Sequence, residues 1–323
     1  MKKQINVKKN AGVTELILEN ETLQLKVVPE LGGKISSLIN KKTNTQFLYS
    51  SNEKMYGLKL PSYGDNFEPP YAFGFDECFP NIASGTFAFN GSEKNLPDHG
   101  ELWTQPWEYE LKGNSIHLSV NGVELNYRFT KSIHLKKDTV EIRYQLENFE
   151  SFPFEYIWSS HPLLNVQAGD KILLPEDIDE MLLVSGTSGE DESNPHQLPW
   201  PWLDDQEKKI DYSFVQSHNS GMAVKLFASQ LKKGIAGIYR KKTNESLIFN
   251  FNISKIPFLG IWLCYGGWPK GTNSEYTIAL EPATGRPDSL STAAKKGESS
   301  KIEIGEIKNW ELNISIVNGQ KLV

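Results

Sequence analysis

The sequence is short of several features that would assign it to common protein classes. Its two cysteines, Cys78 and Cys264, lie far apart in 323 residues, inside apolar or aromatic runs. We therefore expect reduced, buried thiols rather than a disulfide framework. No hydrophobic run approaches the length of a transmembrane helix. The basic N-terminal segment MKKQINVKKN lacks the apolar stretch of a signal peptide. These absences predict a soluble cytoplasmic protein.

Arginine is scarce, and the basic residues form no cluster. Only four of the 34 basic residues are arginine, and the net charge is −6. Nucleic acids and anionic membranes require a clustered basic face, so we expect neither as a partner. Bidentate phosphate binding favours arginine, so a phosphorylated substrate has little support.

The chain is rich in short segments that alternate apolar and polar residues between polar turns. No stretch has a sustained helical period, although residues 289–294 could form one or two turns. Many short strands without interleaved helices predict an all-β sandwich or barrel. No shift in composition marks a boundary, so we predict a single domain over residues 1–323. The clearest predicted strands are Thr14–Leu18, Thr22–Val28, Lys34–Ile39, Ser115–Val120, Thr139–Asn148, Ala223–Ala228, Gly260–Tyr265, Lys301–Glu306 and Trp310–Val317.

Two long stretches interrupt this rhythm, Ser62–Pro80 and Leu183–Ser220. Long irregular segments in a compact domain are usually functional loops. Several of the eight tryptophans lie in predicted loops. Exposed indole rings could stack on sugar rings, or they could pack beneath the loops. The loop tryptophans are Trp103, Trp200, Trp202 and Trp268.

A carboxylate ends one of the predicted strands. The segment YTIALEPATGRPDSL begins as an alternating strand at Tyr276 and is expected to break at Glu281-Pro282. A glutamate held at a strand end has the rigid support that a catalytic base needs. The alternative is a glutamate that begins a solvated turn.

Two histidines have settings that suit proton transfer. His99 lies in the turn LPDHGELW, and His161 lies in SSHPLLNV, just after the predicted aromatic strand Phe152–Ile157. Histidine titrates closest to neutral pH, so it suits proton transfer or hydrogen bonding to hydroxyl groups. Either histidine could instead be a satisfied structural residue.

Other site chemistries have weaker signals. Two histidines and a glutamate could form a three-ligand zinc site, but no His-x-His or His-x-x-x-His pair supports one. We therefore predict no metal. Nothing brings either cysteine near a histidine, and no nucleophile-elbow motif supports a Ser-His-Asp triad.

Taken in order, these segments resemble the aldose 1-epimerase (galactose mutarotase-like) superfamily. The resemblance covers essentially the whole chain through GGKISSL, FDECFPNIASGTF, DHGELW, SSHPLLNV, GIWLCYGGWP and ALEPATG. It implies a large single-domain β-sandwich, the galactose mutarotase-like supersandwich. It also implies that Glu281 is the general base, that His161 is the general acid, and that His99 binds the sugar and stabilises ring opening. The chemistry it implies needs no cofactor.

The sequence departs from the superfamily pattern in the residues that contact the sugar. An arginine of the early segment is replaced by Asn81, preceded by Asp76-Glu77, and a Gly-x-Asp-His segment is missing. The preferred sugar is therefore expected to differ from galactose or glucose. We expect substrate contacts from Asp76, Glu77, Asn81, Trp103 and Trp262.

Three functions follow as hypotheses. The first is an aldose 1-epimerase that interconverts the anomers of a free hexose or related sugar. The second is a non-catalytic carbohydrate-binding protein that has kept the pocket. The third is a glycoside-processing enzyme that pairs Glu281 with Glu77 or Glu101, since that chemistry needs two carboxylates. The partner is a small sugar in each case, and the protein could be a monomer or a homodimer.

Overall fold

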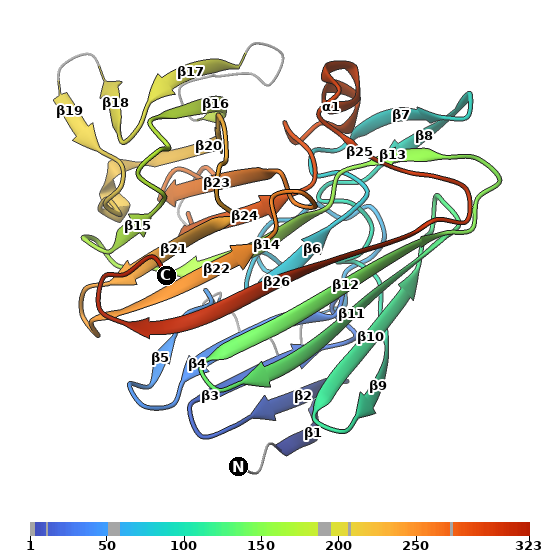
Figure 1. Ribbon diagram of the computed structural model, residues 1–323, viewed down its shortest axis with the longest axis horizontal. Helices are drawn as coiled ribbons and strands as arrows, with labels where there is room; N and C mark the ends of the chain where they lie inside the picture. The colour runs from blue at the N-terminus through green and yellow to red at the C-terminus, as the bar shows by residue number, and fades with distance from the viewer. Residues whose placement is uncertain (1–3, 11, 51–58, 187–194, 206–207, 272–273) are drawn as a thin grey trace.

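The protein is built from two large antiparallel β-sheets that face each other, as the computed structural model in Figure 1 shows. The structure describes residues 4–10, 12–50, 59–186, 195–205, 208–271 and 274–323. Within these residues the only α-helix is α1 (Leu290–Lys296). The predicted all-β class is confirmed. The single-domain organisation stays a prediction.

The larger sheet has twelve strands and carries the candidate site. Its order is β1-β2-β3-β4-β6-β14-β24-β23-β20-β16-β17, with β5 paired to β4. Neighbouring strands are often distant in sequence, so residues far apart in the chain meet on one face. The strands are β1 (Gln4–Asn10), β2 (Val13–Glu19), β3 (Leu23–Val28), β4 (Lys34–Asn40), β5 (Thr45–Gln46), β6 (Phe75–Cys78), β14 (Ser159–Asn165), β16 (Glu180–Gly186), β17 (His196–Pro199), β20 (Met222–Ala228), β23 (Phe258–Tyr265) and β24 (Tyr276–Ala283).

The second sheet has eight strands in the order β15-β21-β22-β26-β12-β11-β10-β9. These strands are β15 (Lys171–Leu173), β21 (Ile235–Arg240), β22 (Glu245–Phe251), β26 (Ile307–Asn318), β12 (Thr139–Asn148), β11 (Tyr127–Lys136), β10 (Ser115–Asn121) and β9 (Glu108–Lys112). Three two-stranded pairs complete the fold: β7 (Gly85–Phe89) with β8 (Ser92–Leu96), β13 (Phe154–Tyr156) with β25 (Ser300–Ile302), and β18 (Trp202–Asp205) with β19 (Lys208–Asp211).

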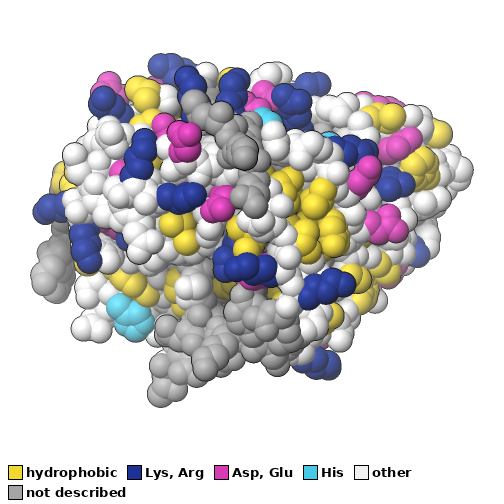
Figure 2. Space-filling model, turned by 90° about the horizontal axis from the view of Figure 1, so that it is seen from below, with side chains coloured by type: hydrophobic (Ala, Val, Ile, Leu, Met, Phe, Trp, Pro, Cys, Tyr) yellow, Lys and Arg dark blue, Asp and Glu magenta, His cyan; other side chains and the backbone are white. Residues whose placement is uncertain are grey.

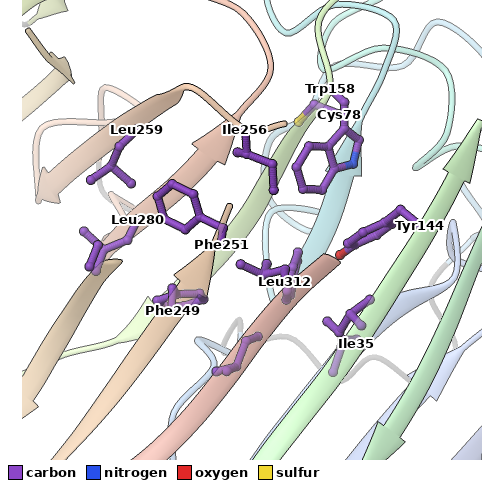
Figure 3. Packing of buried hydrophobic residues seen from close by; sticks show 14 of the residues in the cluster. Ile35, Cys78, Tyr144, Trp158, Phe249, Phe251, Ile256, Leu259, Leu280 and Leu312 are labelled. Carbon is purple, nitrogen blue, oxygen red and sulfur yellow. The ribbon is translucent and has the colours of Figure 1, made fainter. Parts of the chain in front are cut away.

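The hydrophobic core lies between the two large sheets. Figure 3 shows Leu259 and Leu280 from the larger sheet packed near Phe249, Phe251 and Leu312 from the smaller one. Successive side chains of a strand point to opposite faces. Because Leu280 points into this core, Glu281 must point to the outer face of the larger sheet. The sheet therefore separates the core from the candidate site.

Several predicted boundaries were wrong. β24 continues through Glu281 to Ala283 instead of breaking at Glu281. His161 lies inside β14 rather than beyond a strand end. The predicted strand Lys301–Glu306 overlaps β25 (Ser300–Ile302) only at Lys301 and Ile302. The stretch 183–220 was predicted as irregular, yet it contains most of β16, all of β17 to β19 and a 3₁₀ turn, η1 (His218–Ser220).

The surface carries mixed charge. On the face shown in Figure 2, Lys and Arg side chains are interspersed with Asp and Glu. Across the described chain, no helix is long and apolar enough to cross a membrane.

Candidate active site

The floor of the site is a row of side chains across the outer face of the larger sheet. In antiparallel sheets, residues directly opposite each other point to the same face. Asp76 of β6 is opposite His161 of β14, and Glu281 of β24 is opposite Gly260 of β23. The β14–β24 pairs Ser159–Ala283 and Leu163–Ala279 put His161 opposite Glu281. The register of the sheet thus brings His161 and Glu281 together.

The ladder between β14 and β24 opens where these two residues meet. Residues 160–162 are not paired with residues 280–282, although pairing holds on both sides. Pro162 and Pro282 both lie in this gap. Proline has no N–H to give to a ladder, so it is tolerated where no ladder bond is required. The prolines therefore mark a local opening within continuous strands.

Glu281 is fully buried, and its two carboxylate oxygens have different surroundings. Oε2 accepts a hydrogen bond from the Lys225 ammonium of β20. Oε1 lies 3.7 Å from Nε2 of His161 and has no hydrogen-bond partner among the described residues. One oxygen is therefore fixed, while the other is free to accept a proton.

Gly260 leaves the space that the Lys225–Glu281 contact crosses. β23 lies between β20 and β24 in the sheet. A Cβ at position 260 would lie 3.1 Å from Oε2 of Glu281 and 3.2 Å from the ring of Phe227. Such contacts are tighter than packing normally allows. The missing side chain lets Lys225 reach across the intervening strand.

Lys225 joins two carboxylates. Besides Glu281, its Nζ lies 3.4 Å from Oδ1 of Asp288, and the Lys225 side chain is almost completely buried. Burial disfavours the ammonium, but the charges of Asp288 and Glu281 outweigh that effect and raise the pKa of Lys225. Burial raises the pKa of Glu281, and the Lys225 ammonium offsets part of that rise. Lys225 therefore stays charged and helps Glu281 to ionise.

His161 is buried, and its surroundings disfavour the charged imidazolium form. Burial lowers its pKa well below the usual value, and the Lys225 ammonium adds to the effect. Its Nδ1 has no hydrogen-bond partner among the described residues. The ring contacts Phe67 edge-on with centroids 5.1 Å apart, and it contacts His99 in the same way at 4.9 Å. These rings fix the orientation of the imidazole.

His99 is presented by a tight turn. Its φ is +57°, and the Cβ of any other residue at Gly100 would meet the Phe79 backbone at 2.1 Å. Only glycine fits that position. Nδ1 of His99 lies 2.9 Å from Oδ1 of Asp98, and its ring stacks on Phe67 with centroids 4.3 Å apart. Burial opposes the ionisation of Asp98, but the hydrogen bond with His99 lowers its pKa. An ionised Asp98 therefore orients His99.

These groups line a pocket of about 240 Å³. Aromatic rings form part of its wall, and polar side chains converge from β14, β16, β20, β24 and neighbouring loops. Ligand sites commonly combine an apolar wall with a few convergent polar groups. The lining residues are Phe67, Ala72, Ile82, Asp98, His99, His161, Leu163, Ser185, Lys225, Trp262, Trp268, Glu275, Thr277, Glu281 and Asp288.

Half of the predicted site residues line this pocket. Glu281, His161, His99 and Trp262 do so. Asp76, Glu77, Asn81 and Trp103 do not. Asp76 lies beside His161 in the row but is buried in an ion pair with Lys34.

The other three residues support the structure around the pocket. Glu77 points into the core, where it pairs with Lys131 and accepts hydrogen bonds from Tyr144 and Trp158. Nδ2 of Asn81 donates to the carbonyls of Ala83 and Pro97.

The Trp103 ring is buried beneath Phe67, and its Nε1 donates to the carbonyl of Asp98. Trp103 therefore supports the turn that carries His99.

The third hypothesis needed Glu77 or Glu101 beside Glu281. Neither lines the pocket. The Glu101 carboxylate is 0% exposed and accepts hydrogen bonds from the amides of Val123 and Glu124 and from the Tyr127 hydroxyl. The pairing of Glu281 with either residue is therefore not supported.

Sequence reasoning missed Lys225, Asp288 and Glu275. Lys225 reads as an ordinary polar position in the strand MAVKLFA, and Asp288 lies in a turn after a proline. Only the strand order reveals that Lys225 reaches Glu281. Among the residues that the structure describes, no group of three His, Cys, Asp or Glu side chains is arranged to hold a metal ion. The arrangement suits proton transfer between a carboxylate and an imidazole.

The fold is shared with solved structures of low sequence identity. A galactose mutarotase-like protein from Lactobacillus casei ATCC 334 is 15% identical with a TM-score of 0.69, and the match covers 94% of this chain and 100% of that one. A protein from Escherichia coli K12, provisionally described as an aldose 1-epimerase, is 16% identical with a TM-score of 0.68 over 98% and 100% of the two chains.

A galactose mutarotase-like protein from Clostridium acetobutylicum is 13% identical with a TM-score of 0.69, over 98% of both chains. No family model matches the sequence. At these identities the likeness establishes the fold: the chain has the galactose mutarotase-like β-sandwich. The predicted fold class is confirmed.

Proposed function

We propose that the protein is an aldose 1-epimerase that interconverts the α and β anomers of a free, unphosphorylated sugar. The observation that carries the proposal is the pair formed by Glu281 and His161. Oε1 of Glu281 and Nε2 of His161 are 3.7 Å apart at the floor of the pocket. The similar solved structures support the same reaction class, since their names include galactose mutarotase-like proteins.

The reaction is a pair of proton transfers around the sugar ring. Oε1 of Glu281 removes the proton from the C1 hydroxyl while His161 protonates the ring oxygen. The C1–O5 bond breaks, and the open-chain aldehyde forms. Rotation about C1–C2 turns the other face of the aldehyde toward O5. Ring closure then returns both protons in reversed roles, so no cofactor is consumed.

The pKa shifts suit groups that must exchange roles. Burial raises the pKa of Glu281 and lowers that of His161, so the two values move toward each other. A closely matched acid and base can transfer a proton in either direction at little cost. This matters because each group acts as a base in one half of the reaction and as an acid in the other.

The charge of the pocket favours a neutral sugar. Four carboxylates line it, from Asp98, Glu275, Glu281 and Asp288, against the single ammonium of Lys225. A phosphate ester would meet repulsion and would find no arginine among the described residues that line the pocket. This supports a free sugar over a sugar phosphate.

The proposal is tested by polarimetry of freshly dissolved α-anomers of galactose, glucose and xylose. Wild type is expected to speed the approach to anomeric equilibrium. Glu281→Gln is expected to lower the rate about 10²–10⁴-fold, the usual contribution of a general base. The amide keeps the size of the side chain but cannot accept the proton.

Glu110→Gln serves as the matched control, because its side chain is 65% exposed and is not among the residues that line the pocket. It should leave the rate unchanged. A folded wild type that binds these sugars without changing their rotation would contradict the proposal. It would favour the non-catalytic carbohydrate-binding protein instead.

A further inference from the structure

The second sheet ends in an open edge at β9. β9 is the last strand in the order of that sheet, and in Figure 1 it lies at the outer end of the sheet. Among the described residues it pairs only with β10, in an unbroken register. All five of its residues, Glu108–Lys112, are exposed. An edge of this kind offers a row of unused backbone N–H and C=O groups to another strand.

The other three edges of the two large sheets carry features that hinder the pairing of a further strand. β17 ends in Pro199, and β15 has only three residues. β1 carries the neighbouring charges of Lys8 and Lys9. Prolines, short strands and lysines are common ways in which proteins protect sheet edges. β9 has no proline, and the residues that it turns toward the core side, Tyr109 and Leu111, are apolar.

These two apolar side chains of β9 are only partly covered. Tyr109 lies opposite Leu118 and Leu111 lies opposite Ile116, and both partners are buried in the core. Tyr109 and Leu111 therefore face the core side of the sheet. As edge residues they are nevertheless 40% and 38% exposed. A partner strand on this edge would remove part of that apolar area from water, which is favourable.

The hairpin that joins β9 to β10 determines which backbone groups are unused. Lys112 and Ser115 flank a two-residue turn, so they form a hydrogen-bonded pair of the ladder. Such pairs alternate along antiparallel strands with pairs that are not hydrogen-bonded. Tyr109 and Leu111 belong to the second kind, so their N–H and C=O groups point away from β10. These groups are available to a further strand.

A second copy of β9 matches this edge. If two β9 strands run antiparallel about a two-fold axis at Glu110, Tyr109 of each copy lies opposite Leu111 of the other. Those are the residues whose backbone groups are unused, and each such pair can exchange two N–H···O=C hydrogen bonds. The same register places Glu108 of each copy opposite Lys112 of the other. Opposite charges in directly opposing positions stabilise a strand pair.

The charges around this axis balance. Glu110 of the two copies would face each other, and like charges in opposing positions are destabilising. Each Glu110 already has a partner, however, since its Oε2 lies 2.8 Å from Nζ of Lys112. The Arg128 guanidinium lies 3.9 Å from the carboxylate of Glu108. Each copy therefore contributes two carboxylates and two cations to the paired strands.

We propose that β9 is a homodimer interface, at which two copies of the chain join their second sheets edge to edge through Glu108–Lys112. Dimers with two-fold symmetry use the same surface on both copies, as this register does. Two strands of this length form a small interface, so we expect a reversible dimer rather than a permanent one. None of the five residues lines the candidate pocket, so variants of β9 test association without altering that site.

Sedimentation velocity over a range of protein concentrations tests the proposal. Wild type is expected to shift from 36.5 kDa toward twice that mass as the concentration rises. Glu108→Lys and Lys112→Glu each turn both attractive pairs of the symmetric dimer into repulsive ones. Each variant should therefore raise the dissociation constant about tenfold. Glu303→Lys is the matched control, because it makes the same charge change at a side chain that is 61% exposed and outside β9.

A mixture of the two charge variants tests the register. In a heterodimer of Glu108→Lys with Lys112→Glu, both opposing pairs again join opposite charges. The mixture should therefore dimerise as wild type does. Leu111→Pro gives an independent measurement, since proline removes an N–H that points away from β10 and leaves the ladder to β10 in place. It should weaken the dimer while the urea unfolding curve of the monomer stays close to that of wild type.

Three results would contradict the proposal. A wild type that stays monomeric up to about 1 mM would overturn it, because association that weak is not specific. A dimer that neither charge reversal nor Leu111→Pro weakens would overturn it too, because its interface would lie elsewhere. Two weakened charge variants whose mixture stays monomeric would overturn the pairing of Glu108 with Lys112.

Discussion

At the scale of single residues, the site depends on how one carboxylate is held. Lys225 binds one oxygen of Glu281, and Gly260 keeps the path between them open. The remaining oxygen faces His161. The same ammonium also lies near Asp288, so its charge is shared between two acids. In the proposed reaction Lys225 is therefore a positioning residue, because it occupies one oxygen of Glu281 and leaves the other to take the proton.

Removal of this charge should move the pH dependence of the reaction. Lys225→Met takes away the ammonium that lowers the pKa of Glu281 and leaves burial and Asp288, which raise it. Glu281 must be ionised to act as the base. We therefore expect the acid limb of the kcat profile to shift to higher pH, with a larger loss of rate at pH 6 than at pH 8.

Polarimetry across the pH range measures this shift, with Lys112→Met as a control because that lysine is 57% exposed on the second sheet. The position of the limb is the readout, since a merely structural role would lower the rate equally at every pH. An acid limb that does not move would refute the role of Lys225.

The sequence located the candidate catalytic residues better than the residues predicted to bind the sugar. Glu281, His161 and His99 were found because each sits in a recognisable motif, and all three line the pocket. Asp76 and Glu77 were predicted together, although adjacent residues of a strand face opposite ways. Nothing local indicates which face of β6 is the core, so Glu77 was misassigned. Lys225 gave no signal because its role depends on strand order.

At the scale of elements, one error came from a proline. Pro282 predicted a strand end, but β24 continues through it to Ala283. Pro162 likewise lies inside β14. Both are accommodated because the ladder between these strands is open at that point. The open stretch could not be foreseen, since it depends on two strands more than 100 residues apart.

The start and end of α1 depend only on residues close in the sequence, unlike the opening between β14 and β24. α1 begins after Ser289, whose side chain accepts a hydrogen bond from the amide of Thr292. Its end is set by Gly297, which has the left-handed φ of +68° that glycine adopts easily. From the sequence, only one or two helical turns over residues 289–294 were expected, and these capping residues were not used. Asp288, the neighbour of Lys225, directly precedes the cap.

Loss of this cap should cost stability. Ser289→Ala removes the hydrogen bond to Thr292, so we expect the free energy of unfolding to fall by about 1 kcal/mol. Urea denaturation measures it. Ser291→Ala, inside the helix, is the matched control and should be neutral or slightly stabilising, because alanine has the higher helix propensity. An equal effect of both substitutions would contradict the capping role.

At the scale of the whole molecule, a buried ion pair joins the two sheets. Glu77 of β6 pairs with Lys131 of β11 at 3.1 Å, and both side chains are 0% exposed. Lys131 also donates to the carbonyl of Gly33, and Tyr144 and Trp158 donate to Glu77. These contacts of Glu77 and Lys131 lie within or next to the apolar core between the two sheets. The arrangement fixes how the larger sheet lies over the smaller one.

Breaking this pair should destabilise the entire protein. Lys131→Met leaves the Glu77 carboxylate buried without its counter-charge, which typically costs about 3–5 kcal/mol. Lys136→Met on the same strand is the control, because that lysine is 70% exposed in a surface pair worth about 1 kcal/mol or less. Chemical denaturation of both variants provides the measurement. A similar loss of unfolding free energy in both variants would show that the buried ion pair contributes no more to stability than the surface pair.

The fold class was predictable because it needs only the period of the strands and the absence of helical periods. The order of twelve strands in one sheet was not, since β6, β14 and β24 are brought together by contacts across 200 residues. Alternation of apolar and polar residues predicts where strands lie in the sequence, but it does not predict which strands pair in the sheet. The oligomeric state and the cellular location stay predictions.

The placement of His161 and Glu281 on adjacent strands has a consequence for how such a site can change over time. Neighbouring strands lie about 4.8 Å apart in every β-sheet, whatever their side chains. The order of β14 and β24 in the sheet therefore keeps the proposed acid and base on neighbouring strands. Loops around the pocket can change in length without moving these two strands, so a change of specificity through the loops would leave the proposed acid and base where they are.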